Sequence, residues 1–393
     1  MTQHSAQIAI IGGGISGLWL LNSLRNAGYD AVLFEKNTLG SQQTFASQGM
    51  IHGGIKYALG GFTTPASETI ADMPSVWRNC IAGQGPVDLK NLNLLSEDYY
   101  LFSDGSLSSK VTGFFASKSL RGRINALSRA DYPKVFANSK FNGSLYQLQD
   151  IVIDTPALIS KLSQQQTNYI YHAEPQVVTD NGEVSYLQLP QDQSLKADRY
   201  IFAAGAGNAP LLSGTALEKS QMQTRPLQQV MLKGQLPSIY AHAVSLKTVA
   251  KPRITFSTHP ALDGDKVWYL GGNLAEQGVG MTAGKLIDFA QRELKDLLPW
   301  IDLTNAEWAT LNIDKAEPAQ KENNRPDHPF LKCAGNCLVA WPTKLTLVPM
   351  LADMVLDELT GPNTTLVPQA QQGSYPDLPL AQIAKTPWEN SFG

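Results

Sequence analysis

The sequence has 393 residues, of which 43% are hydrophobic and 17% are charged, a balance typical of globular proteins and unlike that of disordered chains. This length exceeds one ordinary core and suits two interleaved domains. The net charge of −3 argues against a dedicated nucleic-acid-binding protein. Cys80, Cys333 and Cys337 have neither the spacing of a disulfide framework nor nearby metal-ligand partners. We therefore predict no metal site and a reducing, cytoplasmic setting.

Two strands and a helix are predicted at the start of the chain, around a glycine-rich turn. Residues 7–11 read as a short buried strand, 18–26 as a helix and 31–35 as a second apolar strand. The turn is Gly12-Gly13-Gly14-Ile15-Ser16-Gly17, and Glu35 ends the second strand. The glycines also interrupt the first apolar run, which argues against a signal peptide or a membrane span. The order strand, G-x-G-x-x-G, helix, strand, acid predicts a dinucleotide-binding βαβ unit.

Each glycine at the motif positions has a predicted role around a pyrophosphate. Gly12 permits the tight turn, Gly14 lets the backbone approach the phosphates, and Gly17 allows the helix to pack closely on the strand. The helix N-terminus offers N–H groups and the positive end of its dipole to phosphate. Glu35 is placed to accept hydrogen bonds from ribose, which disfavours NADP, but the motif alone leaves FAD and NAD open. The predicted nucleotide-binding residues of this unit are Gly12, Gly14, Ile15, Ser16, Gly17, Glu35 and Lys36.

Three further segments resemble the D-amino-acid-oxidase superfamily of FAD-dependent oxidoreductases. Residues 44–57 (TFASQGMIHGGIKY) are similar to its flavin-contacting segment, and most similar to the I-H-G-G-L-R-Y stretch of FAD-dependent glycerol-3-phosphate dehydrogenases. Residues 198–207 (DRYIFAAGAG) resemble its third-strand motif, an apolar strand that ends in A-A-G beside the nucleotide. Residues 343–346 (TKLT) resemble the G-K-L-T of the same dehydrogenases, at a helix that faces the flavin pyrimidine ring.

This resemblance implies an α/β fold with a Rossmann-type, glutathione-reductase-like domain that binds FAD non-covalently. It also implies an inserted antiparallel sheet that holds substrate. The FAD-binding domain is expected to be discontinuous, at residues 1–85, 151–215 and 320–393, and the substrate domain is expected at 86–150 and 216–319. Further cofactor contacts are implied at Ser47, Gln48, Gly49, Met50, Val177, Ala204, Gly205, Lys344, Leu345 and Thr346.

A second nucleotide site is not expected. Residues 278–283 carry glycines near the right spacing, but the preceding residues 273–277 are polar and read as a loop, so no strand leads into them. A small organic molecule, and not NAD(P)H, would then reduce the flavin directly. Residues 283–298 show helical apolar spacing, which indicates packing.

The resemblance also selects candidate catalytic residues. Lys344 is placed to offset the charge that develops at N1–C2=O of a reduced flavin, with a surface lysine as the alternative. His52 is interpreted as a proton acceptor or flavin contact, or equally as a histidine that orders the turn after it. Lys56 and Tyr57 match the R-Y of the dehydrogenase stretch, although a lysine lacks the bidentate fork of arginine.

Basic residues elsewhere are candidates for binding anions. Arg325, in the element NRPDHP, resembles an R-P element whose arginine reaches an acidic group of the substrate, with a solvated loop arginine as the alternative. Arg225 has a similar but weaker claim. Residues 110–129 contain basic residues and no acid, which favours a solvated loop over contact with anionic substrate or lipid headgroups.

We therefore predict an FAD-dependent oxidoreductase, more specifically a dehydrogenase. It would oxidise a small polar alcohol or amine (a hydroxy acid, polyol phosphate or amino acid) by hydride transfer to flavin N5. The expected partners are a small-molecule substrate, possibly anionic, and oxygen or quinone as electron acceptor, with no nucleic acid and at most peripheral membrane contact. One alternative is an oxygen-dependent amino-acid or amine oxidase of the same superfamily. Another is a flavin-binding protein without small-molecule turnover.

Overall fold

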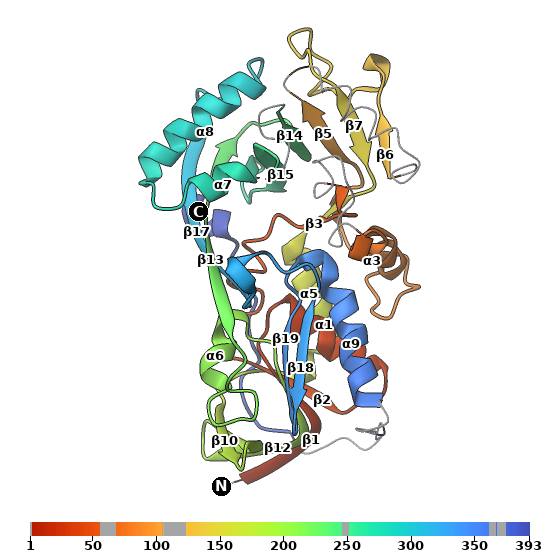
Figure 1. The fold of residues 1–393 in the computed structure, drawn as a ribbon, viewed down its shortest axis with the longest axis vertical. Helices are drawn as coiled ribbons and strands as arrows, with labels where there is room; N and C mark the ends of the chain where they lie inside the picture. The colour runs from red at the N-terminus through yellow and green to blue at the C-terminus, as the bar shows by residue number, and fades with distance from the viewer. Residues whose placement is uncertain are drawn as a thin grey trace.

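Two sheets dominate the computed structural model, which describes residues 2–55, 68–103, 105, 123–245, 251–360, 367 and 375–393. One sheet lies near the marked N-terminus and the other lies at the opposite end of an elongated molecule (Figure 1). Lys56, Tyr57 and most of the basic stretch 110–129 fall outside the described residues. Within the described part, no helix is long and apolar enough to cross a membrane.

The first sheet is mainly parallel and carries the glycine turn. Its strand order is β10-β11-β12-β1-β2-β9, with β19 beside β12 and β18 beside β19. Strands β12, β1, β2 and β9 run parallel to one another, as does β19 to β12. The bounds are β1 (Thr2–Ile11), β2 (Ala31–Glu35), β9 (Ile170–His172), β10 (Gln176–Asp180), β11 (Glu183–Leu189), β12 (Gln193–Phe202), β18 (Phe330–Ala334) and β19 (Cys337–Trp341).

Helices cover one face of this sheet and share a single apolar core with it. These helices are α1 (Ile15–Asn26), α3 (Met73–Ile81), α5 (Thr155–Gln165) and α9 (Val348–Thr360). The sequence explains where they stop and start. Gly28, just past α1, has φ +89°, the left-handed conformation that ends helices. Asp154 caps α5 by accepting the Ala157 N–H at 3.1 Å, and Pro156 occupies the first turn, where no N–H is needed.

The second sheet is mostly antiparallel, in the order β17-β13-β16-β15-β14-β5-β7-β6. Helix α8 (Ala283–Leu297) buries Leu286, Ala290 and Leu294 against one face, as the apolar spacing predicted. The bounds are β5 (Tyr99–Ser103), β6 (Ile124–Ala126), β7 (Leu145–Leu148), β13 (Met222–Gly234), β14 (Ala241–Val244), β15 (Ile254–Pro260), β16 (Lys266–Gly271) and β17 (Glu307–Pro318).

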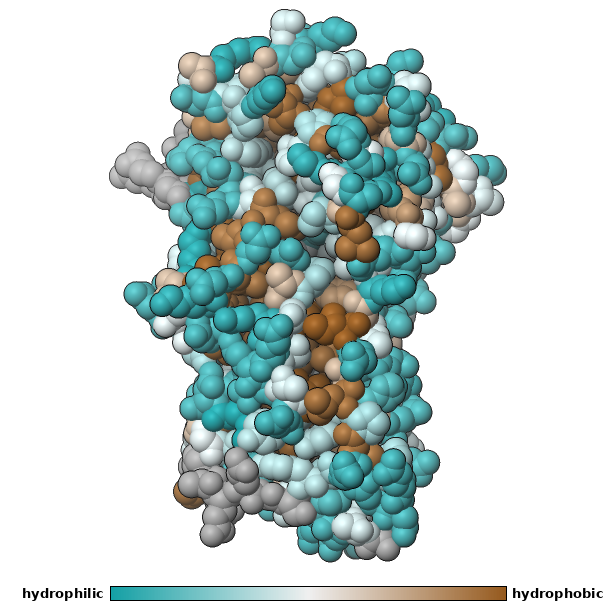
Figure 2. Space-filling view, turned by 180° about the vertical axis from the view of Figure 1, so that it is seen from behind, coloured by the Kyte–Doolittle hydropathy of each residue, from teal (hydrophilic) through white to brown (hydrophobic). Residues whose placement is uncertain are grey.

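Smaller elements join the two sheets. A three-stranded sheet pairs β3 (Met50–Ile51) and β4 (Leu94–Ser96) with β8 (Ile151–Ile153). The short helices are α6 (Asn208–Leu211), α7 (Asn273–Gln277) and α10 (Pro387–Phe392). Seen from behind, apolar residues gather around the narrower middle of the molecule, between two mostly hydrophilic ends (Figure 2).

One sequence-based expectation about local structure is wrong. Residues 273–277, predicted to be a loop, form helix α7. Its five residues are too few to show helical spacing, and the helix is held by burying Leu274 and Ala275. The absence of a strand directly before residues 278–283 still holds, because α7 separates them from β16.

Candidate active site

The turn between β1 and α1 needs glycine at two positions for reasons within the protein itself. Gly12 has φ +117°, and a Cβ on it would lie 2.7 Å from the Ala203 backbone. A Cβ on Gly17 would lie 1.9 Å from the Gly12 carbonyl oxygen. Gly14 differs, because its φ of −74° suits any residue, and a Cβ there would meet only the Thr44 hydroxyl, at 3.3 Å, among the described residues. Glycine at position 14 is thus explained by a group that approaches from outside the turn.

The carboxylate of Glu35 braces this turn from the tip of β2. Its Oε2 accepts the Gly13 N–H at 2.6 Å, and its Oε1 accepts the Asn37 N–H at 2.7 Å. Each carboxylate oxygen can accept a second hydrogen bond, so capacity for a ribose hydroxyl remains. Lys36 pairs with the exposed Glu174 at 3.2 Å.

Two buried hydroxyls fit FAD at this place. The Oγ atoms of Ser16 and Ser47 are buried and have no hydrogen-bond partner in the described part of the chain. An unsatisfied buried hydroxyl costs about 1–3 kcal/mol, so both are suited to a ligand that supplies partners. Ser16 lies in the first turn of α1, a turn that has no acidic residue and whose N-cap, Gly14, has no side chain. The positive end of the α1 dipole is therefore available to a pyrophosphate.

The segment 44–52 connects the glycine turn to the second sheet. Gln48 Nε2 donates to the carbonyl oxygens of Thr255, at 2.9 Å, and Tyr269, at 2.7 Å. The Tyr269 hydroxyl in turn lies within hydrogen-bond distance of two acceptors, the Ala46 carbonyl oxygen at 2.9 Å and Gln229 Oε1 at 2.6 Å. The side-chain amide N–H₂ of Gln48 thus ties this segment to β15 and β16, so the Gln48 contribution to a flavin contact is left to its backbone and its Oε1.

The other candidate cofactor contacts lie at strand ends. Gly49 has φ +69°, and a Cβ there would lie 2.3 Å from the Ile153 carbonyl oxygen, while Met50 begins β3. Ala204 and Gly205 follow β12, directly beside the end of β1, and Gly205 has φ +58°. Val177 lies on β10, which starts three residues after Ala173.

Ala173, just before β10, is in turn bound to the end of β2, because its N–H donates to the Glu35 carbonyl oxygen at 3.0 Å. Val177 is thereby held near Glu35, the residue predicted to bind ribose.

The segments at 44–52 and 343–346 meet, although they are distant in sequence. The Thr346 hydroxyl donates to the carbonyl oxygen of His52 at 3.3 Å, and Trp77 Nε1 donates to the Thr346 carbonyl oxygen at 3.1 Å. His52 is only 4% exposed. The N–H groups of Leu345 and Thr346 belong to the first turn of η7 (Leu345–Leu347), whose donors have no acceptor within the helix.

Lys344 is half-buried directly before this turn. Its ammonium donates to the carbonyl oxygens of Pro326, at 2.9 Å, and Asp327, at 3.4 Å. Burial lowers the pKa of Lys344 to about 8; the Asp327 charge opposes this decrease and the Lys315 charge adds to it. The alternative of a solvated surface lysine therefore does not describe this side chain.

Charged side chains from β13 and β17 lie beside Lys344. Arg225 and Lys315 both pair with Glu317, at 2.7 and 2.9 Å, and Lys315 also donates to the Thr343 carbonyl oxygen at 2.7 Å. Glu317 is 1% exposed. Burial acts to raise the pKa of Glu317, but the Lys315 charge and the Arg225 hydrogen bond outweigh it, so this pKa lies below its ordinary value. Burial lowers the pKa of Lys315 despite the opposing Glu317 carboxylate.

Arg325 belongs to the same charged region. It forms an ion pair with Glu276 of α7, which also pairs with Lys251 at 2.7 Å. Its loop is fixed to β13, because Gln223 Nε2 donates to the Asn324 carbonyl oxygen at 2.9 Å. We refer to these groups together as the charged junction: Arg225, Lys251, Glu276, Lys315, Glu317, Arg325, Asp327 and Lys344.

Sequence reasoning missed five members of the charged junction: Lys251, Glu276, Lys315, Glu317 and Asp327. Lys315 and Glu317 are two residues apart on β17 and so share a face, a period-2 signal that was present in the sequence. Glu276 lies on α7, which was predicted to be a loop. Among the described residues, no group of three or more His, Cys, Asp or Glu side chains could hold a metal ion.

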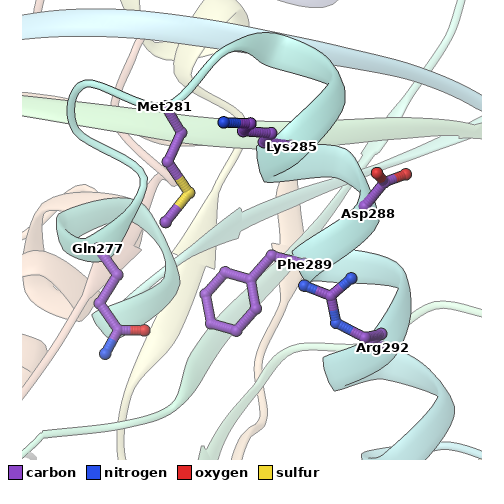
Figure 3. Close-up of a pocket in the computed structure, with 6 residues that line it drawn as sticks. All are labelled: Gln277, Met281, Lys285, Asp288, Phe289 and Arg292. Carbon is purple, nitrogen blue, oxygen red and sulfur yellow. The ribbon is translucent and has the colours of Figure 1, made fainter.

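A separate cleft of about 710 Å³ lies between α7 and α8. It is lined by Gln277, Met281, Lys285, Asp288, Phe289 and Arg292 (Figure 3). The glycines that suggested a second nucleotide loop lie beside it. A Cβ on Gly278 would lie 2.8 Å from the Leu286 side chain, and Gly280 has φ +81°, so packing and a turn account for both.

Comparison with known proteins agrees with this geometry. A family model described as "FAD dependent oxidoreductase" matches residues 7–312. A probable FAD-dependent oxidoreductase of Pseudomonas aeruginosa is 45% identical over 391 residues, covering 99% of this chain and 98% of the relative. A crystal structure of an FAD-dependent oxidoreductase from the same organism superposes with a TM-score of 0.86, at 40% identity and with 100% of both chains covered.

More distant solved structures share the fold. Glycine oxidase from Geobacillus kaustophilus has a TM-score of 0.64 at 15% identity, with 90% of this chain and 94% of that chain covered. L-proline dehydrogenase from P. horikoshii has a TM-score of 0.64 at 14% identity, with 94% and 96% covered.

The chain belongs to the D-amino-acid-oxidase family of FAD-dependent oxidoreductases. It is an enzyme whose cofactor is FAD, for which non-covalent binding is typical of the family, and the resemblance, the α/β fold class and the FAD cofactor predicted from the sequence are confirmed. The special likeness to glycerol-3-phosphate dehydrogenases stays a prediction.

Proposed function

We propose that this enzyme oxidises a small polar amine or alcohol that carries a carboxylate or phosphate group. The observation that carries this proposal is the charged junction beside residues 343–346. Its cationic groups, Arg225, Lys251, Lys315, Arg325 and Lys344, outnumber its carboxylates, Glu276, Glu317 and Asp327. A surplus of positive charge in a partly buried site attracts and orients an anion.

Each residue of this site would have a separate role in catalysis. When bound, FAD would supply the oxidising chemistry by accepting a hydride equivalent from the substrate. Arg325 would leave its ion pair with Glu276 and bind the anionic group of the substrate. His52, buried beside Thr346, would accept the proton of the substrate N–H or O–H at a ring nitrogen.

Lys344 and the first-turn N–H groups of η7 would stabilise negative charge at the pyrimidine edge of the ring. The Lys344 ammonium is already held by two carbonyl oxygens, so it needs little reorganisation. Lys56 and Tyr57, outside the described residues, remain predicted substrate contacts.

An anaerobic screen tests the substrate class. Amino acids, hydroxy acids and polyol phosphates are mixed one by one with the yellow holoenzyme, and bleaching of the flavin absorption is followed. We expect bleaching by an anionic compound and none by its neutral amide or ester. Equal rates with the neutral analogue, or no bleaching by any compound, would contradict the proposal.

Readmission of air then identifies the electron acceptor. Rapid return of the yellow colour with release of peroxide supports an amino-acid or amine oxidase. Slow return in air, but rapid return on addition of a soluble quinone, supports the dehydrogenase.

A further inference from the structure

A segment outside the predicted cofactor contacts holds the two sheets in place. Residues 375–393, here called the strap, first attach to the parallel sheet. The Asp377 N–H donates to Gln193 Oε1 at 3.2 Å, and the His172 N–H donates to the Pro379 carbonyl oxygen at 2.7 Å. Leu380 forms a β-bridge with Tyr171. The strap thus pairs with β9, the strand at one edge of the parallel sheet.

The strap next contacts the loop that follows Glu35. The N–H of Leu39 donates to the Gln382 carbonyl oxygen at 2.7 Å, and the Ala384 N–H donates to the Leu39 carbonyl oxygen at 3.0 Å. Leu39 is 1% exposed, and its side chain lies 2.6 Å from where a Cβ on Gly13 would be. The loop after Glu35 is therefore held between the strap and the glycine turn.

The strap ends on the second sheet, where α10 lies beside β17 (Figure 1). A capping box between Thr386 and Glu389 fixes the start of this short helix. Its Trp388 is 5% exposed, and its ring centroid lies 4.4 Å from that of His259 and 6.3 Å from that of Tyr269.

Through Tyr269, Trp388 reaches the flavin-contacting segment. The Tyr269 hydroxyl lies within hydrogen-bond distance of the Ala46 carbonyl oxygen, and the Tyr269 carbonyl oxygen accepts from Gln48. Residues 39–48 are therefore restrained at both ends. The strap binds Leu39 at the first end, and Tyr269 contacts Ala46 and Gln48 at the second end. Both anchors of the segment that leads from ribose to flavin are thus supported by one strap.

We propose that the strap is a clamp for FAD and that Trp388 is a positioning residue that acts through Tyr269. Backbone pairing at Leu39 fixes the ribose side, and the buried Trp388 ring fixes the flavin side. Because both contacts restrain the same segment, loss of either lets the segment move away from the cofactor. The inference depends on FAD binding and not on the proposed substrate.

The test compares variants of the full-length holoenzyme by the rate at which FAD is released on dilution, followed by flavin fluorescence. Trp388→Ala should release FAD about tenfold faster. This expected effect is smaller than the loss of folding free energy that truncation of a buried tryptophan usually causes. It should also blur the fine structure of the bound flavin absorption. Trp388→Phe, which keeps a ring against His259, should restore both properties to near those of the wild type.

Trp300→Ala serves as the matched control. Trp300 packs on Phe141, within the core on the opposite face of the second sheet. This variant should lower the melting temperature and leave FAD release and the flavin spectrum unchanged. If Trp388→Ala behaves like Trp300→Ala, the strap is merely structural and the proposal is overturned.

Should Trp388→Ala fail to fold, Ala384→Pro examines the other anchor. Proline removes the N–H that donates to the Leu39 carbonyl oxygen. Faster FAD release supports the clamp, and unchanged release refutes it.

Discussion

The glycine turn and the charged junction are each held together by different physical means. In the turn, backbone atoms approach so closely that a single added Cβ on Gly17 would collide with the Gly12 carbonyl oxygen. In the charged junction, side chains from β13, β17, α7 and two loops balance one another through ion pairs. Steric fit therefore governs the glycine turn, and charge governs the junction, where we propose that the substrate binds.

This difference bears on how each region responds to change. A steric site fails when anything is added, whatever its charge or the pH. A charged site shifts gradually as one partner is removed or titrated, while the fold and cofactor remain. We therefore expect substrate preference to vary most easily in the charged junction, consistent with the general rule that sites are grafted on shared folds.

Gly17→Ala should have the largest effect and tests the steric half of this contrast. The added Cβ forces α1 away from β1, so we expect a colourless protein that no longer retains FAD, with a loss of about 1–3 kcal/mol in stability. Flavin absorbance and thermal unfolding measure the two effects. Gly284→Ala on α8 is the control, because a Cβ there meets no described atom within 4 Å. A yellow, stable Gly17→Ala protein would refute the steric account.

Glu317→Gln should come next in size. It leaves Arg225 and Lys315 without their shared carboxylate, and we expect the free energy of unfolding to fall by about 2 kcal/mol, because both partners are partly solvated. Because the folded-state pKa of Glu317 is depressed, its stabilisation is present above the ordinary carboxyl pKa of 4.5 and is lost as the pH falls through the folded-state value.

Urea unfolding of wild type and Glu317→Gln at neutral and acidic pH provides the measurement. The two curves should converge in acid. Glu307→Gln, at the exposed start of the same strand, should behave like the wild type at both pH values. Equal losses in the two variants would remove the special role of the buried carboxylate.

Arg325→Ala should weaken the binding of anions about tenfold, the cost of losing one charged hydrogen bond. The apparent affinity of holoenzyme for benzoate, read from the flavin spectrum, measures this effect. Glu276→Gln should act in the opposite direction, because the competing carboxylate is gone. Arg292→Ala, in the cleft between α7 and α8, should change nothing. Unaltered benzoate affinity in Arg325→Ala would exclude the proposed anchor.

Lys344→Met should have an effect of similar size, a decrease of about 30 mV in the flavin midpoint potential, or about 1.4 kcal/mol. The lost ammonium no longer stabilises negative charge on the reduced ring. In the wild type this stabilisation is present below the lowered pKa of about 8 and declines above it. Potentiometric titration across this pH range should show the decline in the wild type and not in the variant. An identical potential in both proteins would contradict the role of Lys344.

The glycine turn and the strands beside it could be predicted from the sequence, because their motifs are short and contiguous. The strand predicted at 31–35 matches β2, and the A-A-G motif follows β12 directly beside β1. Gly17 reports a close approach to Gly12, only five residues away, whereas the close approach at Gly12 is to the Ala203 backbone directly after β12.

The charged junction was only partly readable because its contacts join distant elements. Arg225 meets Glu317 across 92 residues, through the pairing of β13 with β17. Arg325 meets Glu276 on a helix too short to show a pattern. The strap was not predicted either, since its backbone hydrogen bonds at Leu39 and His172 leave no mark on side-chain identity and Trp388 packs on residues more than 100 positions away.

A crystal structure of the FAD-bound enzyme tests the central assignment most directly. We expect the isoalloxazine ring to lie between residues 44–52 and 343–346. Its pyrimidine edge should face Lys344 and the N–H groups of Leu345 and Thr346. A ring whose pyrimidine edge faces any other segment would contradict it.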